Sequence, residues 1–439
     1  MTIEEFLELL KKYNVQSLEG VKIEGDLEID LESMGSISPA MLYELGKELG
    51  MAAQHLSRAS QLLGYSAGVA VPASEPGTVK PSAAPAGVKP VEELKLIESQ
   101  FRPYIAEYPG VIQEVKLGAK KDEGGSRKSV VTLGGEKSLP FYLFDAPQPN
   151  PPAVTMDIFD MNITLPKAVR EHYEDVLDDP AEWAKKAVNE YGADLITIHM
   201  VSTDPYVKDT PASKAVGVIE DVLQAVDVPL VIGGSGNKDK DPEVLEKAAE
   251  VGEGEKMLLA SATLDMDWER IANAAKEYGH VVLSWTQMDI NNQKTLNRYL
   301  LRRAKLPPEQ IIMDPTTAAL GYGLDYAFTN MERIRLSALK GDNDLLFPMS
   351  SGTTNAWGAR EAWMKDSPSE EDTPWGPREL RGPLWEIVTG VSLALAGVDM
   401  FMMMHPGAVA AMKETLSTLR GELKETDVPE PDDWITMEE

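Results

Sequence analysis

The sequence predicts an α/β protein whose main part is a (β/α)8 TIM barrel, preceded by a small helical and β N-terminal module and a Pro/Ala-rich linker. Two observations predict the barrel. Eight apolar, strand-like runs follow one another between residues 153 and 405, and a helical pattern separates each run from the next. Apolar strands that alternate with helices require a parallel sheet covered by helices, and eight such units favour a closed barrel over an open sheet.

Residues 1–66 are predicted to form a helix–strand–helix assembly module. A capping box and an apolar stripe predict a short amphipathic helix over 2–13, and alternating apolar residues predict a strand over 21–31. A second helix, over 38–64, carries leucines and alanines in heptad spacing, and such a seam requires a partner helix. That partner is either the first helix of the same module or a helix of another subunit.

Residues 67–90 are predicted to be a linker, because they consist mainly of Pro, Ala, Gly, Ser and Val. In a polyproline-like conformation such a linker extends to about 70 Å and suits an assembly arm. Residues 91–152 are predicted to cover one end of the barrel, with a short helix over 91–99 and strand-like stretches over 111–117 and 129–133.

The barrel itself is predicted over 153–420, and residues 421–439 are predicted to form an acidic tail. Each of its eight units should contribute one strand to the barrel wall and one helix to the outer ring. The eight predicted strands are 153–160, 194–202, 228–234, 256–263, 280–287, 310–317, 345–352 and 398–405.

Composition excludes several classes of function. The chain has 42 basic and 71 acidic side chains and a formal net charge of −29, so it should repel nucleic acid and anionic lipid surfaces. It contains no cysteine, and therefore cannot supply thiolates to an iron–sulfur cluster or build a cysteine zinc site. The acidic N-terminus and the lack of an apolar run of about 18 residues predict a cytoplasmic protein with no membrane segment.

The candidate site is the rim formed by the carboxyl ends of the strands, where barrels build their sites. This rim is rich in hydroxyl and amide side chains but poor in titratable groups, so it favours binding of a large polar ligand over catalysis. The alternative is that these residues only turn loops and cap helices. The candidate binding residues are Gly233, Gly234, Ser235, Asn237, Thr316, Thr317, Ser351, Thr353, Thr354 and Asn355.

Other features of the rim leave their function open. The glycine turn at 233–236 could hold an anion with backbone amides, although it lacks the spacing of a dinucleotide fingerprint and the lysine of a phosphate loop. His199 and His405 could bind a metal or act as general bases, but no zinc-site motif accompanies them. We therefore predict no metal site and no catalytic residue.

Two residue groups near the rim could add chemistry or contacts. Asp157, Asp160 and Asp314 could form a carboxylate cluster for proton transfer. Four tryptophans fall within 29 residues after the seventh predicted strand, which suits either a ligand lid or interface, or a local hydrophobic cluster. These are Trp357, Trp363, Trp375 and Trp385.

Five motifs carry a resemblance to a known family. They are Ile-Phe-Asp-Met at 158–161, Val-Ile-Gly-Gly-Ser-Gly-Asn at 231–237, Leu-Ser-Trp-Thr-Gln at 283–287, and longer runs at 313–323 and 347–357. They closely resemble the delta subunits of the acetyl-CoA decarbonylase/synthase complex, which are the small subunits of the corrinoid/iron–sulfur protein. The likeness covers nearly the whole chain, and the N-terminal extension resembles the longer archaeal form.

The resemblance implies a non-catalytic subunit. In that family a gamma subunit holds the iron–sulfur cluster and most of the corrinoid contacts, the delta barrel helps to enclose the corrinoid, and the alpha, beta and epsilon subunits complete the complex. The methyl group then moves between a tetrahydropterin and the acetyl-CoA synthase site. On this interpretation the candidate binding residues face the corrinoid.

Two alternatives remain open. The chain could be a methyltetrahydropterin-dependent corrinoid methyltransferase in its own right, with Asp160, Asn162 and Asp314 in contact with the pterin. It could also be a purely structural barrel that touches no cofactor. The predicted arm and linker, together with the strand motifs, favour a subunit of the complex over the methyltransferase.

Overall fold

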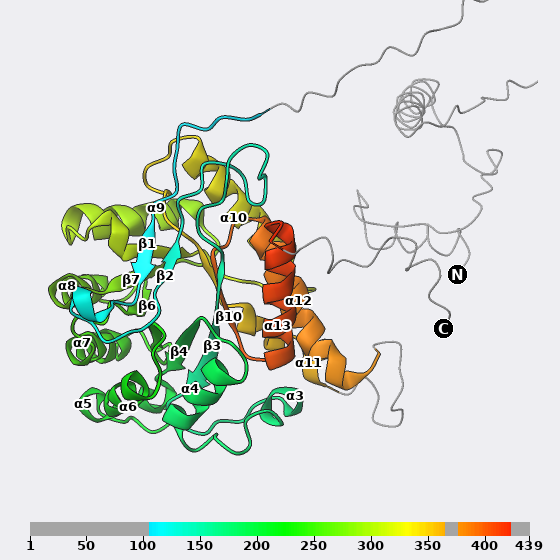
Figure 1. Cartoon of the computed structure of the whole chain (residues 1–439). Helices are drawn as coiled ribbons and strands as arrows, with labels where there is room; N and C mark the ends of the chain where they lie inside the picture. The colour runs from blue at the N-terminus through cyan, green and yellow to red at the C-terminus, as the bar shows by residue number, and fades with distance from the viewer. Residues whose placement is uncertain (1–104, 365–375, 423–439) are drawn as a thin grey trace, which may run out of the picture. The chain divides into compact units, whose positions relative to one another are not determined.

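The computed structural model describes residues 105–364 and 376–422 (Figure 1). All of them belong to the compact unit Ser99–Glu439. The predicted module at 1–66, the linker at 67–90 and most of the predicted acidic tail lie outside the described residues.

Eight parallel strands form the barrel, in the spatial order β8-β7-β6-β5-β4-β3-β10-β9. A parallel bridge between Met313 and Met349 joins β8 to the start of β9 and closes the sheet. The strands are β3 (Ala153–Phe159), β4 (Leu195–His199), β5 (Leu230–Gly233), β6 (Leu258–Ala262), β7 (Val281–Trp285), β8 (Ile311–Asp314), β9 (Ser350–Ser351) and β10 (Met400–Met403). Each strand lies within one predicted run, so the predicted barrel is confirmed.

The strand β9 is much shorter than the predicted run over 345–352. Pro348 has no backbone N–H to donate, and the chain enters a 3-10 helix at Thr353, so little of this run can join the sheet ladder. The carbonyl of Pro348 nevertheless accepts a hydrogen bond from the amide of Met313 at 2.8 Å, which contributes to closure of the barrel.

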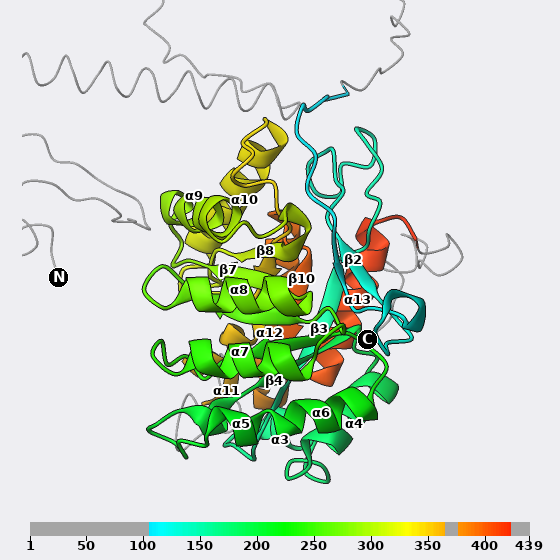
Figure 2. The ribbon, with the colours of Figure 1, turned by 90° about the vertical axis from the view of Figure 1, so that its left-hand side faces the viewer.

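Helices surround the strands, and Figure 2 shows α7, α8 and α9 stacked on the outside of the sheet. Several begin at an aspartate that accepts backbone hydrogen bonds, such as Asp179 before α4 and Asp289 before α9. The α-helices are α3 (Lys167–Arg170), α4 (Pro180–Asn189), α5 (Ala212–Ala215), α6 (Gly217–Ala225), α7 (Asp241–Val251), α8 (Trp268–Tyr278), α9 (Ile290–Arg298), α10 (Leu324–Leu339), α11 (Arg360–Trp363), α12 (Arg378–Leu395) and α13 (Pro406–Leu419). Shorter turns are η1 (Lys121–Glu123), η2 (Val201–Thr203), the π-helical η3 (Tyr299–Arg303), η4 (Pro308–Gln310) and η5 (Thr353–Gly358).

An antiparallel hairpin closes the amino end of the barrel. It consists of β1 (Val115–Leu117) and β2 (Val131–Leu133), which lie across the barrel strands in Figure 1. The buried side chains of Val115, Leu117 and Leu133 pack against the first inward-facing residues of the strands, such as Leu195 and Leu258. Burying an aliphatic side chain of this size contributes about 1.5–3 kcal/mol, so the hairpin acts as an apolar plug.

A buried ion triad also holds the amino end together. Arg335 of α10 contacts Glu136, which follows β2, at 3.2 Å and Asp399, which precedes β10, at 2.6 Å. Asp399 also accepts a hydrogen bond from the amide of Met349 at 2.7 Å. Burial and the charge of Glu136 outweigh the attraction of Arg335 and raise the pKa of Asp399 to about 7. The triad thus ties the hairpin segment to α10 and to two barrel strands.

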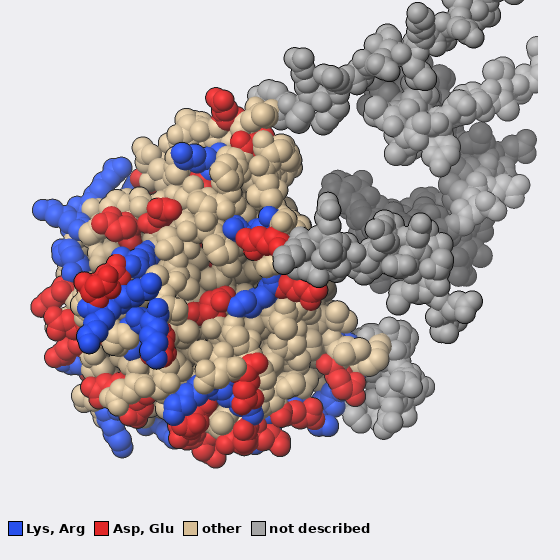
Figure 3. Space-filling view, in the orientation of Figure 1, with Lys and Arg blue, Asp and Glu red and all other residues tan. Residues whose placement is uncertain are grey.

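Charges of both signs cover the outer surface, and Figure 3 shows lysine and arginine side chains interspersed with acidic ones over one face. Many of these are exposed ion pairs, such as Lys128 with Asp227 at 2.6 Å. Among the described residues, none of the helices combines the length and the apolar character needed to cross a bilayer.

Candidate functional site

The carboxyl end of the barrel holds a buried carboxylate next to a histidine. Asp157 on β3 is 2% exposed, and its Oδ2 lies 3.3 Å from Nε2 of His199 at the end of β4. The same Oδ2 accepts a hydrogen bond from Oγ1 of Thr354 at 2.6 Å. Its other oxygen, Oδ1, is buried and has no hydrogen-bond partner in the described part of the chain. One carboxylate oxygen therefore carries both contacts, and the other is unsatisfied.

Residues on the neighbouring strands β3 and β5 hold the ring of His199 in place. Phe159 stacks on the imidazole with ring centroids 5.2 Å apart. A Cβ atom at Gly233 would lie 2.9 Å from Nδ1 of His199, so glycine leaves the space that the ring needs. Burial opposes protonation of His199, but the charge and hydrogen bond of Asp157 outweigh it and raise the pKa of the imidazole.

The three predicted aspartates do not form one cluster. The charges of Asp157 and Asp160 both act on His199. Asp160 accepts hydrogen bonds from the amide and hydroxyl of Ser202, and burial raises its pKa. Asp314 at the end of β8 is 8% exposed, and burial raises its pKa to about 7, opposed only by the amide of Thr316. Two aspartates therefore gather at His199, and Asp314 stands apart.

The glycine turn already holds a carboxylate of the protein itself. Asp241, at the start of α7, accepts hydrogen bonds from the amide and hydroxyl of Ser235 at 2.9 and 2.8 Å and from the amide of Gly236 at 2.8 Å. A Cβ atom at Gly234 would lie 2.4 Å from Cγ of Asp241, which explains the glycine. Because Asp241 occupies these two amides, they are not free to hold an external anion.

The other predicted binding residues divide into two groups. Ser351, Thr317 and Thr353 are buried and joined through their hydroxyl groups, with Thr317 2.8 Å and Thr353 2.9 Å from Ser351. They stabilise the seam between β8 and β9. The remaining members of the predicted set are at least partly accessible at the rim: Ser235, Asn237, Thr316, Thr354 and Asn355.

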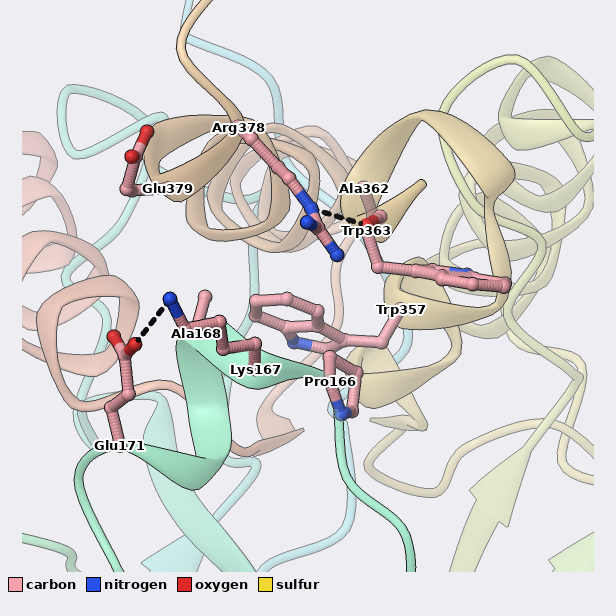
Figure 4. Close-up of a pocket in the computed structure, with 9 residues that line it drawn as sticks. All are labelled: Pro166, Lys167, Ala168, Glu171, Trp357, Ala362, Trp363, Arg378 and Glu379. Atoms are coloured by element: carbon pink, nitrogen blue, oxygen red, sulfur yellow. Dashed lines mark hydrogen bonds and ion pairs between the residues drawn. The ribbon is translucent and has the colours of Figure 1, made fainter. Parts of the chain in front are cut away.

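Two hollows flank the carboxyl end of the barrel, and sequence reasoning found only parts of their linings. One, of about 580 Å³, lies at the ends of β6 and β7 and includes Thr263, Trp285 and Gln287. The other, of about 470 Å³, lies between α3, α11 and α12 (Figure 4). Trp357 and Trp363 line this second hollow together with four charged residues: Lys167, Glu171, Arg378 and Glu379.

The four predicted tryptophans have separate roles. Gly382 in α12 makes room for Trp357, because a Cβ atom there would lie 2.1 Å from Cζ3 of the indole. Trp385 donates a hydrogen bond from Nε1 to the carbonyl of Leu320 at 3.2 Å. Trp363 is 41% exposed, and Trp375 lies outside the described residues.

His405 is a helix cap. Its Nδ1 accepts hydrogen bonds from the amides of Gly407 and Ala408 at 3.1 and 3.3 Å, at the start of α13. Burial and the neighbouring His172 lower the pKa of His405 to about 4, so the ring is neutral and serves as an acceptor. Glu386 accepts hydrogen bonds from the amides of Met404 and His405, and burial raises its pKa to about 7. The described residues contain no group of three or more His, Asp or Glu side chains that could hold a metal ion.

The fold and this rim define a class of protein: a (β/α)8 barrel whose mouth carries hydroxyl and amide side chains and one imidazole bound to a carboxylate. A family model, "CO dehydrogenase/acetyl-CoA synthase delta subunit", matches residues 114–367. The chain belongs to the family of delta subunits of the acetyl-CoA decarbonylase/synthase complex, and the predicted resemblance is confirmed.

Named relatives support this assignment. The chain is 65% identical to the delta subunit of Archaeoglobus fulgidus over 100% of this chain and 99% of that one. It is 56% identical to subunit delta 2 of Methanosarcina acetivorans, again over 100% of this chain and 99% of that one. It is 53% identical to the delta subunit of Methanothermobacter thermautotrophicus over 79% of this chain and 87% of that one. A crystal structure of dihydropteroate synthetase aligns with a TM-score of 0.43 and 16% identity, covering 65% of this chain and 96% of that one, a likeness too distant to bear on function.

Proposed function

We propose that this chain is the non-catalytic small subunit of a corrinoid/iron–sulfur protein. It would pair with a gamma subunit that holds the iron–sulfur cluster and most of the corrinoid contacts, within a complex that also contains alpha, beta and epsilon subunits. The observation that carries this proposal is the similarity to delta subunits over the whole chain.

The chemistry of this chain supports the same division of labour. It contains no cysteine, so thiolate ligands for a cluster would come from the partner. The accessible rim residues fit a corrinoid, because the peripheral carboxamides of a corrin both donate and accept hydrogen bonds, as Ser, Thr and Asn side chains do. When bound, the corrinoid supplies the cobalt that carries a methyl group between tetrahydropterin and the acetyl-CoA synthase site.

The role of this chain's own residues would be to bind, orient and shield the cofactor. Asn355 is exposed, and its Nδ2 is anchored to the carbonyl of Thr317 at 3.0 Å, so its position is fixed before a ligand arrives. Asn237 is held in the same way by the amides of Asp239 and Lys240. A preorganised rim loses little side-chain freedom on binding, which favours affinity.

A second candidate function is a methyltransferase that uses a methyltetrahydropterin directly. The observation that favours it is a pair of carboxyl groups at strand ends, the partly buried Asp160 and the buried Asp314, whose raised pKa values suit proton exchange. Asn162, the third predicted pterin contact, is exposed and donates a hydrogen bond to Asp178 at 2.9 Å.

Methyl transfer by the purified chain separates the two functions. The assay supplies methyltetrahydropterin and free reduced cobalamin, first to the chain alone and then to the chain with the gamma subunit. We expect no transfer by the chain alone and transfer only with the gamma subunit present. Activity of the chain alone that falls in Asp160→Asn would overturn the non-catalytic assignment.

A further inference from the structure

Helix α12 is apolar on its outer face as well as on its inner face. At 3.6 residues per turn, four aliphatic side chains on the outer face lie within about 80° of one another around the helix axis. We call these four side chains the α12 stripe. They are exposed to solvent: Leu380 at 56%, Leu384 at 52%, Val388 at 39% and Leu395 at 47%. On the inner face of the helix, Leu393 and Ala394 are buried in the core.

The outer face of α12 also lacks charge along most of its length. After Arg381 the helix has a single charged residue, Glu386, which is fully buried. The outer face of α7 is different, because Lys247 and Glu250 form an exposed ion pair there at 2.6 Å. A helix that is apolar on both faces is typical of one that is covered on both faces. The α12 stripe therefore predicts a partner on the outside of the barrel.

The stripe runs from the mouth of the barrel to its amino end. At the start of α12, Arg378 lines the hollow of Trp357 and Trp363 at the mouth. Beyond its end, the carbonyl of Gly397 accepts a hydrogen bond from Arg335 of the buried ion triad. At 1.5 Å per residue the stripe is about 22 Å long. Figure 1 shows α12 beside α13 on the outside of the barrel, so a partner seated there also reaches the mouth.

Two tyrosines add to the apolar surface on the segment that packs beside α12. Tyr322 is 51% exposed and Tyr326 is 71% exposed. The hydroxyl of Tyr322 donates a hydrogen bond to Glu361 of α11 at 3.0 Å, and the amide of Leu320 donates one to Thr389 of α12 at 3.2 Å. These bonds fix the segment before a partner arrives. Rigid, exposed tyrosines are common anchors of protein interfaces.

Charge decides between a second copy of this chain and a different subunit. The chain has a formal net charge of −29, and a second copy would bring the same charge to the interface, so the two copies should repel each other. The chain belongs to a family of subunits of a larger complex. The proposed function pairs it with a gamma subunit whose cofactor faces the mouth, and the stripe adjoins that mouth.

We propose that the α12 stripe, together with Tyr322 and Tyr326, is the surface that binds the gamma subunit through an uncharged, apolar face of that subunit. This inference rests on the proposed function and names the surface that the pairing uses. A gamma subunit seated along α12 contacts the stripe and, at the mouth, the candidate binding residues of the rim.

Thiol labelling of the full chain tests the proposal. The chain has no cysteine, so Leu384→Cys and Val388→Cys each introduce a single thiol. Iodoacetamide alkylates each variant alone and in the assembly with the gamma subunit, and intact mass spectrometry follows the labelling of this chain. We expect assembly to slow labelling at both positions at least about tenfold, because the core of an interface excludes solvent.

Glu250→Cys is the matched control. The side chain of Glu250 is 52% exposed, as Leu384 is, and it lies on α7. That helix follows β5, which is four strands away from β9 in the closed sheet and hence on the opposite side of the barrel from α12. Assembly should change its labelling rate by less than about twofold.

Leu384→Glu measures the contribution of the stripe to binding. The side chain is exposed in the free chain, so the substitution should leave the thermal stability of the free chain nearly unchanged. In the assembly it would bury a charge, and we expect the Kd for the gamma subunit to rise at least about tenfold. Glu250→Lys should leave this Kd unchanged within about twofold.

The outcomes separate this inference from the proposed function. If the heterodimer forms and the thiols on the stripe stay reactive, the stripe is not the interface, and the proposed function still stands. If no heterodimer forms with the unsubstituted chain, both are wrong. If the stripe is already protected in the free chain, size-exclusion chromatography identifies what covers it: a dimer indicates a second copy, and a monomer indicates another segment of this chain. Either result overturns the inference.

Discussion

The two ends of the barrel treat buried carboxylates in opposite ways. At the amino end, Glu136 and Asp399 face the guanidinium of Arg335. At the carboxyl end, Asp314 is buried with a single backbone amide, and Asp157 keeps one oxygen without a partner among the described residues. The contacts of Arg335 with Glu136 and Asp399 join elements of the fold, although burial still raises the pKa of Asp399 to about 7. Carboxyl groups without a cation are retained where a ligand or proton completes them.

This difference matches the division of labour that barrels usually show. The amino end is filled by the apolar plug of β1 and β2 and has no need of solvent or ligand. The carboxyl end exposes a rim and two hollows. Substitutions that remove the cation beside the carboxylates at the amino end should therefore destabilise the protein. Substitutions that replace a buried carboxyl group at the carboxyl end with a neutral side chain should stabilise it.

The largest effect is expected from Arg335→Met. Removing the guanidinium leaves Glu136 and Asp399 buried without a cation, which should lower the free energy of unfolding by about 3–5 kcal/mol. Urea unfolding followed by circular dichroism measures this change. Arg302→Met is the matched control, because Arg302 is 72% exposed and lies 3.5 Å from Asp344, and its loss should change stability by less than about 0.5 kcal/mol. Equal losses in the two variants would show that the triad does not hold the amino end together.

Asp314→Asn should raise the free energy of unfolding rather than lower it, and the size of this gain should depend on pH. The pKa of Asp314 is about 7 in the folded protein and 3.8 as a reference, so the folded carboxyl keeps its proton over that range. The free energy of unfolding of the wild type should therefore fall as pH rises from about 4 to about 7. Asparagine has no charge to bury and can still accept from Thr316. The variant should gain up to about 4 kcal/mol over the wild type at pH 8 to 9, and little at pH 4.

Urea unfolding of wild type and Asp314→Asn at a series of pH values checks this prediction. Glu386 and Asp399 also have pKa values raised to about 7, but both residues are present in both proteins, so the difference between the proteins isolates Asp314. If the difference in the free energy of unfolding between the two proteins is the same at pH 5 and pH 8, Asp314 is already ionised in the folded state at low pH.

Gly382→Ala tests whether the tryptophan hollow at the carboxyl end is rigid. A Cβ atom would lie 2.1 Å from Trp357, so the indole must move, at a cost of about 1–3 kcal/mol. Gly217→Ala is the control, because a Cβ atom there meets nothing within 4 Å, and alanine should be neutral or stabilising by up to about 1 kcal/mol. If thermal unfolding shows the same stability for both variants, the hollow can rearrange freely.

The barrel could be predicted from the sequence because its signal is local. Apolar runs such as the one over 153–160 identify strands without knowledge of their neighbours, and all eight were found. The length of β9 was overestimated because Pro348 interrupts the run over 345–352 and the 3-10 helix that begins at Thr353 ends it. The two-residue strand still joins β10 in the expected place.

The site was harder to predict because its partners are distant in the sequence. Thr354 and Asp157 are 197 residues apart, and nothing in either segment indicates that they meet. The same holds for Gly233, whose lack of a side chain makes room for His199 and not only for a turn. Hydroxyl residues could be recognised as strand-end groups, but only packing shows that Ser351 is buried and Asn355 is exposed.

The smallest expected effect on stability comes from replacing two buried hydroxyl groups that lie between the two ends of the barrel. The hydroxyl groups of Thr155 and Thr197 are fully buried and lie 2.8 Å apart, one step below Asp157 and His199 along the same strands. Thr155→Val or Thr197→Val alone leaves one hydroxyl without a partner and should cost about 1–3 kcal/mol, whereas the double variant should be nearly neutral. Urea unfolding of all four proteins gives the coupling energy. If the double variant costs as much as the sum of the single ones, these hydroxyls belong to the polar network of the mouth, and the boundary between the compensated and uncompensated ends lies deeper in the barrel.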